Sequence, residues 1–356
     1  MDNRRQKQLT EVAKGFTAAN DRISIAVLLF DWSLYGLAVV AAVVASAIWV
    51  KLIAVVVAGT AISMLFILGH DAAHRSLVSS KRLNPVLARL VFLPCLHNYT
   101  LWVIQHNRLH HQSSNVKGLN SYSPLSPEEF CRASFGRRVL ERIYRWPLGF
   151  GAYYLVERWS KHKFFPRARI EPKQRARAWG DFSILSVWAI FLIWALLQLS
   201  ARFGDADAAW TIFWGFVAPF LVWNQLMGTT AFLQHTHPRV PWFRTYREAR
   251  SMKSQAELTV LVQYPAWYDM LSHNIMQHQA HHINPRIPWF RLKSAQRCLT
   301  PLLGSDAVVQ EMGFGYLMTL VKHCQLYDYD SHEWVPFARG FQTIKTRQFI
   351  TSRDFG

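Results

Sequence analysis

The chain has 356 residues, of which 51% are hydrophobic and 14% aromatic, and its 40 Lys and Arg outnumber its 22 Asp and Glu. High hydrophobicity with strong positive charge favours a membrane protein over a nucleic-acid-binding protein, which needs basic patches but no long uncharged apolar runs. The four cysteines are scattered and form no CxxC pair, so they predict neither a disulfide framework nor a cysteine zinc site.

Four uncharged stretches are long enough to cross a bilayer, because about 20 apolar residues span its hydrocarbon core. They are the segments 32–50, 52–69, 182–200 and 208–233. We expect a tight turn at Val50 and Lys51 between the first two, and another at 202–207 between the last two. The sequence therefore predicts two transmembrane hairpins.

Positive charge is distributed unevenly around these spans. Of the 40 Lys and Arg, only Lys51 and Arg202 lie in the two short turns. Because basic residues accumulate in cytosolic segments, both chain ends and the long connections are expected in the cytosol. The predicted parts are a cytosolic N-terminal segment (1–31), a first hairpin (32–69), a cytosolic segment with two histidine clusters (70–181), a second hairpin (182–233) and a cytosolic segment with a third cluster (234–356).

Most of the 15 histidines lie in short clusters. HDAAH follows the second span directly, HNRLHH lies in the first long cytosolic segment, HQAHH lies in the second, and LQHTHP follows the fourth span. Residues three or four apart face the same side of a helix, so each cluster can direct two rings at one point. Eight or more imidazoles are too many for one ion and indicate two. Imidazole suits iron, zinc, copper and nickel, so the residues alone leave the metal open.

The order HDAAH, HNRLHH, HQAHH resembles the three histidine boxes of membrane fatty acid desaturases, from about residue 25 to about residue 300. The resemblance implies an all-α integral membrane fold, with four transmembrane helices in two hairpins and a helical cytosolic cap that holds two iron ions. It also implies O2 as co-substrate. Carried over box by box, the implied ligands are His70, His74, His106, His110, His111, His278, His281 and His282. A ninth ligand is implied just past the fourth span, where His235 is preferred and His237 and His273 are alternatives.

Three charged residues are further candidates. Asp71, inside the first box, can accept a hydrogen bond from a ligand ring, although a helix-surface charge is the alternative. If the substrate is a free fatty acid, its buried carboxylate needs a cation, because burying an unpaired charge is costly. Arg108 and Arg239 are the candidates for that role, with surface ion pairs as the alternative.

The resemblance implies O2-dependent removal of hydrogen from a fatty acid or acyl chain to form a C=C bond, most simply desaturation. Oxidative decarboxylation of free fatty acids to 1-alkenes is the alternative. An alkyl-chain hydroxylase is less favoured, because the glutamates of its boxes are missing. A non-enzymatic metal-binding protein is also less favoured, because it would place ionisable groups within the spans, and the four stretches contain no Lys, Arg, Asp or Glu.

No haem, flavin or nicotinamide motif is present. Electrons are therefore expected from an external ferredoxin or cytochrome-type donor with its reductase. A basic cytosolic face would attract such an acidic donor, and the same charges would hold anionic lipid.

Overall fold

The computed structural model describes residues 3–119, 122–167, 170–204, 207–252 and 255–340, and these are mostly helical. Four helical runs are long and apolar enough to cross a membrane. They are α2 (Asp21–Val44), α3 (Ile48–Ala73), α9 (Pro172–Phe203) and a continuous run of α10 (Ala208–Ile212), the π-helix η4 (Phe213–Val217) and α11 (Ala218–His235).

Shorter elements connect and surround one end of these runs. The first half of the chain contributes α1 (Asn3–Lys14), α4 (Leu83–Val91), α5 (Tyr99–Val103), η1 (Ile104–His110), α6 (Pro127–Arg132), α7 (Phe135–Tyr144), η2 (Pro147–Gly149), α8 (Phe150–Tyr153) and η3 (Tyr154–Phe164). The second half contributes α12 (Tyr246–Met252), η5 (Gln255–Leu258), β1 (Val260–Gln263), α13 (Ala266–Leu271), α14 (His278–Ile283), α15 (Trp289–Leu303), η6 (Gly304–Asp306), β2 (Val308–Glu311), α16 (Phe314–His323), β3 (Leu326–Asp328) and β4 (Glu333–Val335).

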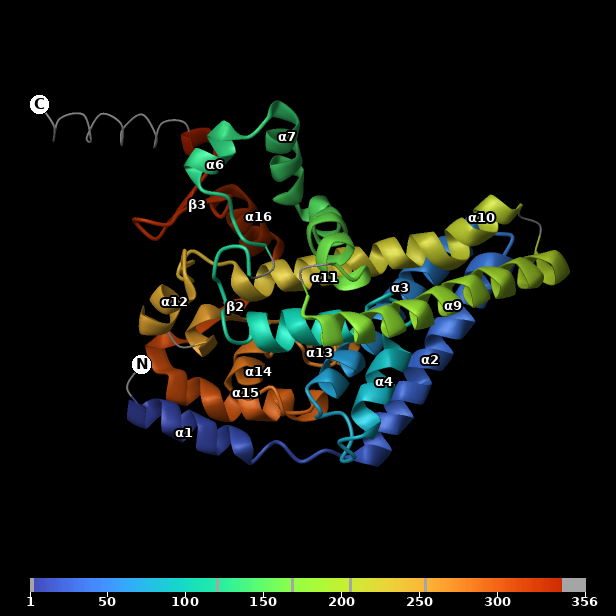
Figure 1. The fold of residues 1–356 in the computed structure, drawn as a ribbon, viewed down its shortest axis with the longest axis horizontal. Helices are drawn as coiled ribbons and strands as arrows, with labels where there is room; N and C mark the ends of the chain where they lie inside the picture. Colours follow the sequence, from blue (N-terminus) through green and yellow to red (C-terminus); the bar gives the residue numbers. More distant parts are fainter. Residues whose placement is uncertain (1–2, 120–121, 168–169, 205–206, 253–254, 341–356) are drawn as a thin grey trace, which may run out of the picture.

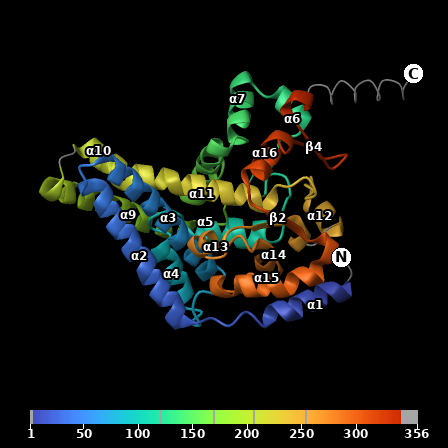
Figure 2. The same ribbon diagram turned by 180° about the vertical axis from the view of Figure 1, so that it is seen from behind.

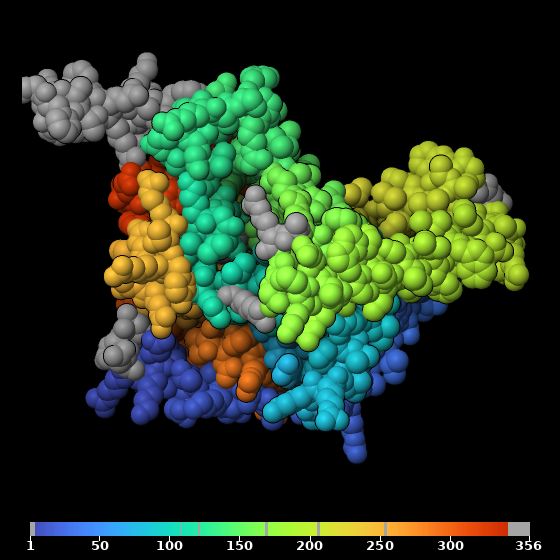
Figure 3. Space-filling view, viewed as in Figure 1, coloured from blue at the N-terminus to red at the C-terminus, as the bar shows by residue number. Residues whose placement is uncertain are grey.

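The long helices extend together from the rest of the molecule (Figure 1). In Figure 3 the far ends of α9 and α10 project as a narrow arm. The long helices carry large apolar side chains that are exposed. Leu37 on α2 is 71% exposed, and Ile190 and Trp194 on α9 are 69% and 57% exposed. Such a contiguous apolar surface is unfavourable in water. The chain is therefore an integral membrane protein whose long helices face lipid.

The turn between α2 and α3 lies at 45–47, so the turn predicted at Val50 and Lys51 is wrong. Lys51 is in the first turn of α3, and its Nζ donates to the carbonyls of Ala42 (3.3 Å) and Val43 (3.1 Å) at the end of α2. The last carbonyls of a helix have no partner within that helix, so the lysine stabilises this end. The charge of Lys51, which predicted a turn, thus belongs to the first turn of a helix.

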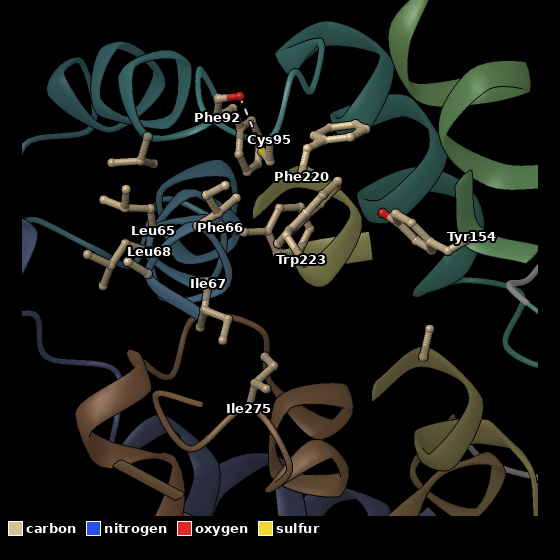
Figure 4. Packing of buried hydrophobic residues seen from close by; sticks show 14 of the residues in the cluster. Leu65, Phe66, Ile67, Leu68, Phe92, Cys95, Tyr154, Phe220, Trp223 and Ile275 are labelled. Atoms are coloured by element: carbon tan, nitrogen blue, oxygen red, sulfur yellow. Dashed lines mark hydrogen bonds between the residues drawn. The ribbon is translucent and has the colours of Figure 1, made fainter. Parts of the chain in front are cut away.

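Small residues allow α11 to approach two neighbours closely. A side chain at Gly59 on α3 would meet the Cβ of Val222 at 2.5 Å, and one at Gly228 would meet the carbonyl oxygen of Phe150 in α8 at 2.2 Å. Small residues at such contacts are typical of helix packing in membranes. Figure 4 shows the resulting core, where Phe66 of α3 faces Trp223 of α11.

The end of the molecule that carries the histidines is held by shorter helices and two small sheets. Seen from behind, α1 runs along α15 (Figure 2), where Leu9 packs in one cluster with Leu299. Strand β1 pairs with β2 in parallel, and β3 pairs with β4 in antiparallel orientation. The all-α prediction missed these strands because each is only three or four residues long.

Candidate metal centre

The structure gathers nine histidines into two adjacent groups. Within each group, one ring nitrogen from each histidine lies within 4.8 Å of those of all the others. Group one consists of His70, His74, His106, His111 and His281, and group two of His110, His235, His278 and His282. The groups adjoin, since the ring centroids of His111 and His282 are 4.6 Å apart.

The second box divides between the groups because its backbone is a π-helix. Residues 104–110 form η1, in which hydrogen bonds join residues five apart. His106 and His111, five apart, therefore converge, and their Nε2 atoms are 3.1 Å apart. His110 points to group two instead, with its Nε2 3.2 Å from that of His282. The α-helical spacing used for the sequence would have paired His106 with His110.

The third box divides as its spacing predicts. On α14, His278 and His282 are four residues apart and share group two, with their Nε2 atoms 3.1 Å apart. The intervening His281 turns to group one, where its Nε2 lies 3.0 Å from that of His111. Gln279 anchors this helix, because its Nε2 donates to the carbonyls of Thr259 and Val308, both at 3.3 Å. The small parallel sheet thus helps to hold the third box in place.

Short contacts between ring nitrogens fit metal ions better than hydrogen bonds. The Nε2 of His111 lies about 3 Å from two other Nε2 atoms, and so does the Nε2 of His282. A neutral ring nitrogen offers either one proton or one lone pair, so it cannot satisfy two such neighbours. Ligand nitrogens about 2.1 Å from a shared ion come to lie about 3 Å apart. The buried Nε2 atoms of His70 and His74, moreover, have no hydrogen-bond partner.

Burial keeps these rings in the metal-binding form. Desolvation and the neighbouring rings lower the pKa of His74, His106 and His281 well below the ordinary value. The same causes lower the pKa of His278 and His282. The rings are therefore neutral at physiological pH, and each has a lone pair for a metal ion.

The groups differ in the side chains that hold their rings. In group one, Asp71 Oδ1 lies 3.2 Å from Nδ1 of His70, and its Oδ2 accepts a hydrogen bond from the backbone N–H of Trp289 at 2.6 Å. In group two, Nδ1 of His282 lies 3.3 Å from Ser114 Oγ. Nδ1 of His235 lies 3.2 Å from the carbonyl oxygen of Leu258.

Of four further site residues predicted from the sequence, three lie outside the two histidine groups, and the side chain of the fourth lies outside the described residues. His273 contacts Asp31 of α2 (Nε2 to Oδ2, 2.8 Å), so a charge sits within the first long helix, paired with a histidine. Nδ1 of His237 accepts a hydrogen bond from the backbone N–H of Arg239. The guanidinium of Arg239 lies on the surface and donates to the carbonyl oxygen of Ser305 at 2.7 Å. The side chain of Arg108 lies outside the described residues.

A cavity of about 320 Å³ leads to both groups. Its mostly apolar wall comes from α3, α11, η3 and the segment around α13. His70 and His106 of group one and His278 of group two line it directly. The sequence did not single out the cavity residues on η3 and α13, because they carry no motif; they include Tyr154, Lys163, Trp267 and Tyr268.

Long lipid-facing helices, two histidine groups and an apolar cavity together define an integral membrane protein with a histidine-rich candidate metal site. Comparison with known proteins specifies its class further. The fatty acid desaturase family matches residues 23–311, which include all nine grouped histidines. The chain belongs to this family.

The relatives include plant and cyanobacterial enzymes. The chloroplastic omega-6 fatty acid desaturase of Brassica napus is 27% identical over 285 residues, covering 79% of this chain and 60% of the relative. The sn-1 oleoyl-lipid 12-desaturase of Anabaena variabilis is 29% identical over 290 residues, covering 78% of this chain and 77% of the relative. The chain thus spans about 60% of the length of the chloroplastic enzyme.

Proposed function

We propose that the chain is an O2-dependent fatty acyl desaturase that holds two iron ions, one in each histidine group. The observation that carries the proposal is the apolar cavity that His70, His106 and His278 help to line in a member of this family. Relatives named for desaturation of oleoyl lipid support an acyl chain as the substrate.

In this proposal the ligands are His70, His74, His106, His111 and His281 for one ion, and His110, His235, His278 and His282 for the other. When bound, the irons supply the oxidising power, with O2, that removes hydrogen from an unactivated C–H bond. The protein positions the chain and excludes water. Phe66, Trp102 and Ile275 provide an apolar wall for the chain.

The decarboxylating alternative is not favoured by the relatives, which are named as desaturases. Purified enzyme with a reductant system and O2 tests the two reactions. We expect gas chromatography–mass spectrometry to show an unsaturated product of unchanged chain length. A volatile alkene one carbon shorter, from a free acid, would contradict desaturation.

For topology, we propose two transmembrane hairpins (32–69 and 182–233), with the segments 1–31, 70–181 and 234–356 on the cytosolic side. The charge distribution supports this orientation. An impermeant thiol reagent should label Lys51→Cys only from outside the cell, whereas the exposed native Cys298 should react only after the cytosolic side is opened. The reverse pattern would overturn the orientation.

For electron supply, we propose an external ferredoxin or cytochrome-type donor with its reductase, attracted to the basic cytosolic face. The net charge of +18 supports an acidic partner. Because exposed charges are screened by salt, the second-order rate of reduction should fall as ionic strength rises. A rate independent of ionic strength would contradict this docking mode.

A further inference from the structure

Two buried basic side chains lie on η3, and one of them lines the cavity. Lys163 is 6% exposed and lines the cavity, and Arg158 is 7% exposed. Both are on η3, five residues apart, which places them on the same side of a π-helix. Within the described residues, neither side chain is paired with a carboxylate. Lysine and arginine are rarely buried without a partner, so this part of the site suits an anionic group.

The surroundings of Lys163 place such an anion close to the histidines. Its Nζ lies 5.8 Å from the centroid of the Trp102 ring, which in turn stacks on His106 with 4.2 Å between centroids. Tyr154 forms the adjacent wall, with its hydroxyl engaged by Nε2 of His97 at 3.0 Å, and Figure 4 shows its ring directed toward Trp223. The hydroxyl of Tyr154 therefore already has a hydrogen-bond partner. The ammonium of Lys163 lies near the Trp102 ring and has no hydrogen-bond partner among the residues that the structure describes.

The residues that line the cavity differ widely in burial. Val56 is 55% exposed and Trp267 is 61% exposed, whereas Trp102 is 1% exposed and Lys163 is 6% exposed. A chain that enters past the exposed residues thus meets a basic side chain among the buried ones. The volume of about 320 Å³ is near the lower limit for ligand pockets and suits one chain with a small head group.

We propose that Lys163, with Arg158 beside it, binds the carboxylate of a free fatty acid among the buried residues of the cavity wall. This deepens the proposed function and rests on it. The carboxylate then fixes the register of the chain, and the position of the new double bond is counted from the carboxyl end.

The electrostatics of Lys163 agree with this assignment. Desolvation, with a further contribution from Arg158, lowers the pKa of Lys163 well below its ordinary value. A bound carboxylate favours the charged ammonium and reverses that effect. The anion and the cation thus each remove the cost of burying the other.

Equilibrium binding without reductant tests the site separately from turnover. We expect the wild-type protein to bind radiolabelled dodecanoic acid at least about tenfold more tightly than methyl dodecanoate, which lacks the charge. Lys163→Met should abolish this preference, and Lys163→Arg should keep it. Lys173→Met, an exposed lysine on α9, is the matched control and should bind as wild type. Equal binding of acid and ester by the wild type, or a preference that survives in Lys163→Met, would overturn the proposal.

Two further measurements keep the test decisive. If Lys163→Met does not fold, Arg158→Gln should lower the preference by a smaller factor, and an unchanged preference there would count against the site. Dodecanoic, tetradecanoic and hexadecanoic acids should give a double bond at the same position from the carboxyl end. A position constant from the methyl end would overturn the carboxylate anchor and leave desaturation intact. Absence of any unsaturated product would instead contradict the proposed function.

Discussion

The two histidine groups contain similar rings but are built differently. Group one takes both histidines of the first box, has five members, and is partly open, since His106 and His111 are half-buried. Group two takes none from the first box, has four members, and is buried throughout. It is completed by His235 from the end of α11.

The groups also differ in what orients their rings. The carboxylate of Asp71 contacts His70 in group one, whereas neutral oxygens of Ser114 and Leu258 contact His282 and His235 in group two. A carboxylate raises the basicity of a ligand ring more than a hydroxyl or a carbonyl does. The two proposed metal positions are therefore unequal, and we expect variants to perturb one without the other.

The largest effect is expected from removing one ring of either group. His74→Ala and His282→Ala should each lower the rate of product formation by more than about a hundredfold, since losing even an outer partner of a ligand costs about 10–100-fold. Metal analysis should show preferential loss of one iron in each variant. His323→Ala changes an exposed histidine outside both groups and should leave rate and iron content unchanged. Full activity in His74→Ala or His282→Ala would remove that residue from the ligand set.

Asp71→Asn tests the carboxylate of group one. Its side chain keeps an oxygen for the N–H of Trp289 but loses the charge beside His70. We expect a loss of about 10–100-fold in iron affinity or rate. Chelator titration followed by metal analysis measures the affinity. Unchanged affinity and rate would show that Asp71 is only a structural charge.

Gly228→Ala tests whether α11 can be displaced without disturbing group one. The new Cβ would meet backbone atoms of Phe150, which cannot rotate away, so we expect a destabilisation of about 1–3 kcal/mol. Group two should suffer more, because only it takes a ligand from α11. Gly36→Ala is the control, since nothing lies within 4 Å of its added Cβ. Equal thermal unfolding of the two variants in detergent would contradict this packing account.

The smallest effect is expected from Ser114→Ala. Its Oγ lies 3.3 Å from Nδ1 of His282 and 3.1 Å from the carbonyl of His110. One neutral hydrogen bond contributes about 0.5–1.5 kcal/mol, so iron affinity should fall by less than about tenfold. A loss as large as that of Asp71→Asn would remove the proposed inequality between the groups.

The sequence indicated the composition of the site but not its division. Spacing within the boxes is local, and the structure places all nine of the preferred histidines in the two groups. Which ring joins which group depends on the π-helix at η1, and no residue pattern in HNRLHH distinguishes a π-helix from an α-helix. His110 therefore lies in a different group from His106, against α-helical spacing.

Four helices of membrane length were predictable because uncharged runs of that length are rare in other settings. The ends of these helices were less predictable. Lys51 and Asp31 lie within helices because each finds a partner that hydropathy cannot reveal. Lys163 was missed for a related reason: in the basic stretch 158–163 a buried lysine looks like a solvated one.

Iron stoichiometry tests the central claim, that two histidine groups each hold one metal ion, most directly. The wild-type protein, purified in detergent, is analysed for iron by mass spectrometry and for its electronic state by Mössbauer spectroscopy. Two irons per chain in two distinguishable environments are predicted from the unequal groups. A single bound iron, or zinc in place of iron in active enzyme, would contradict the account.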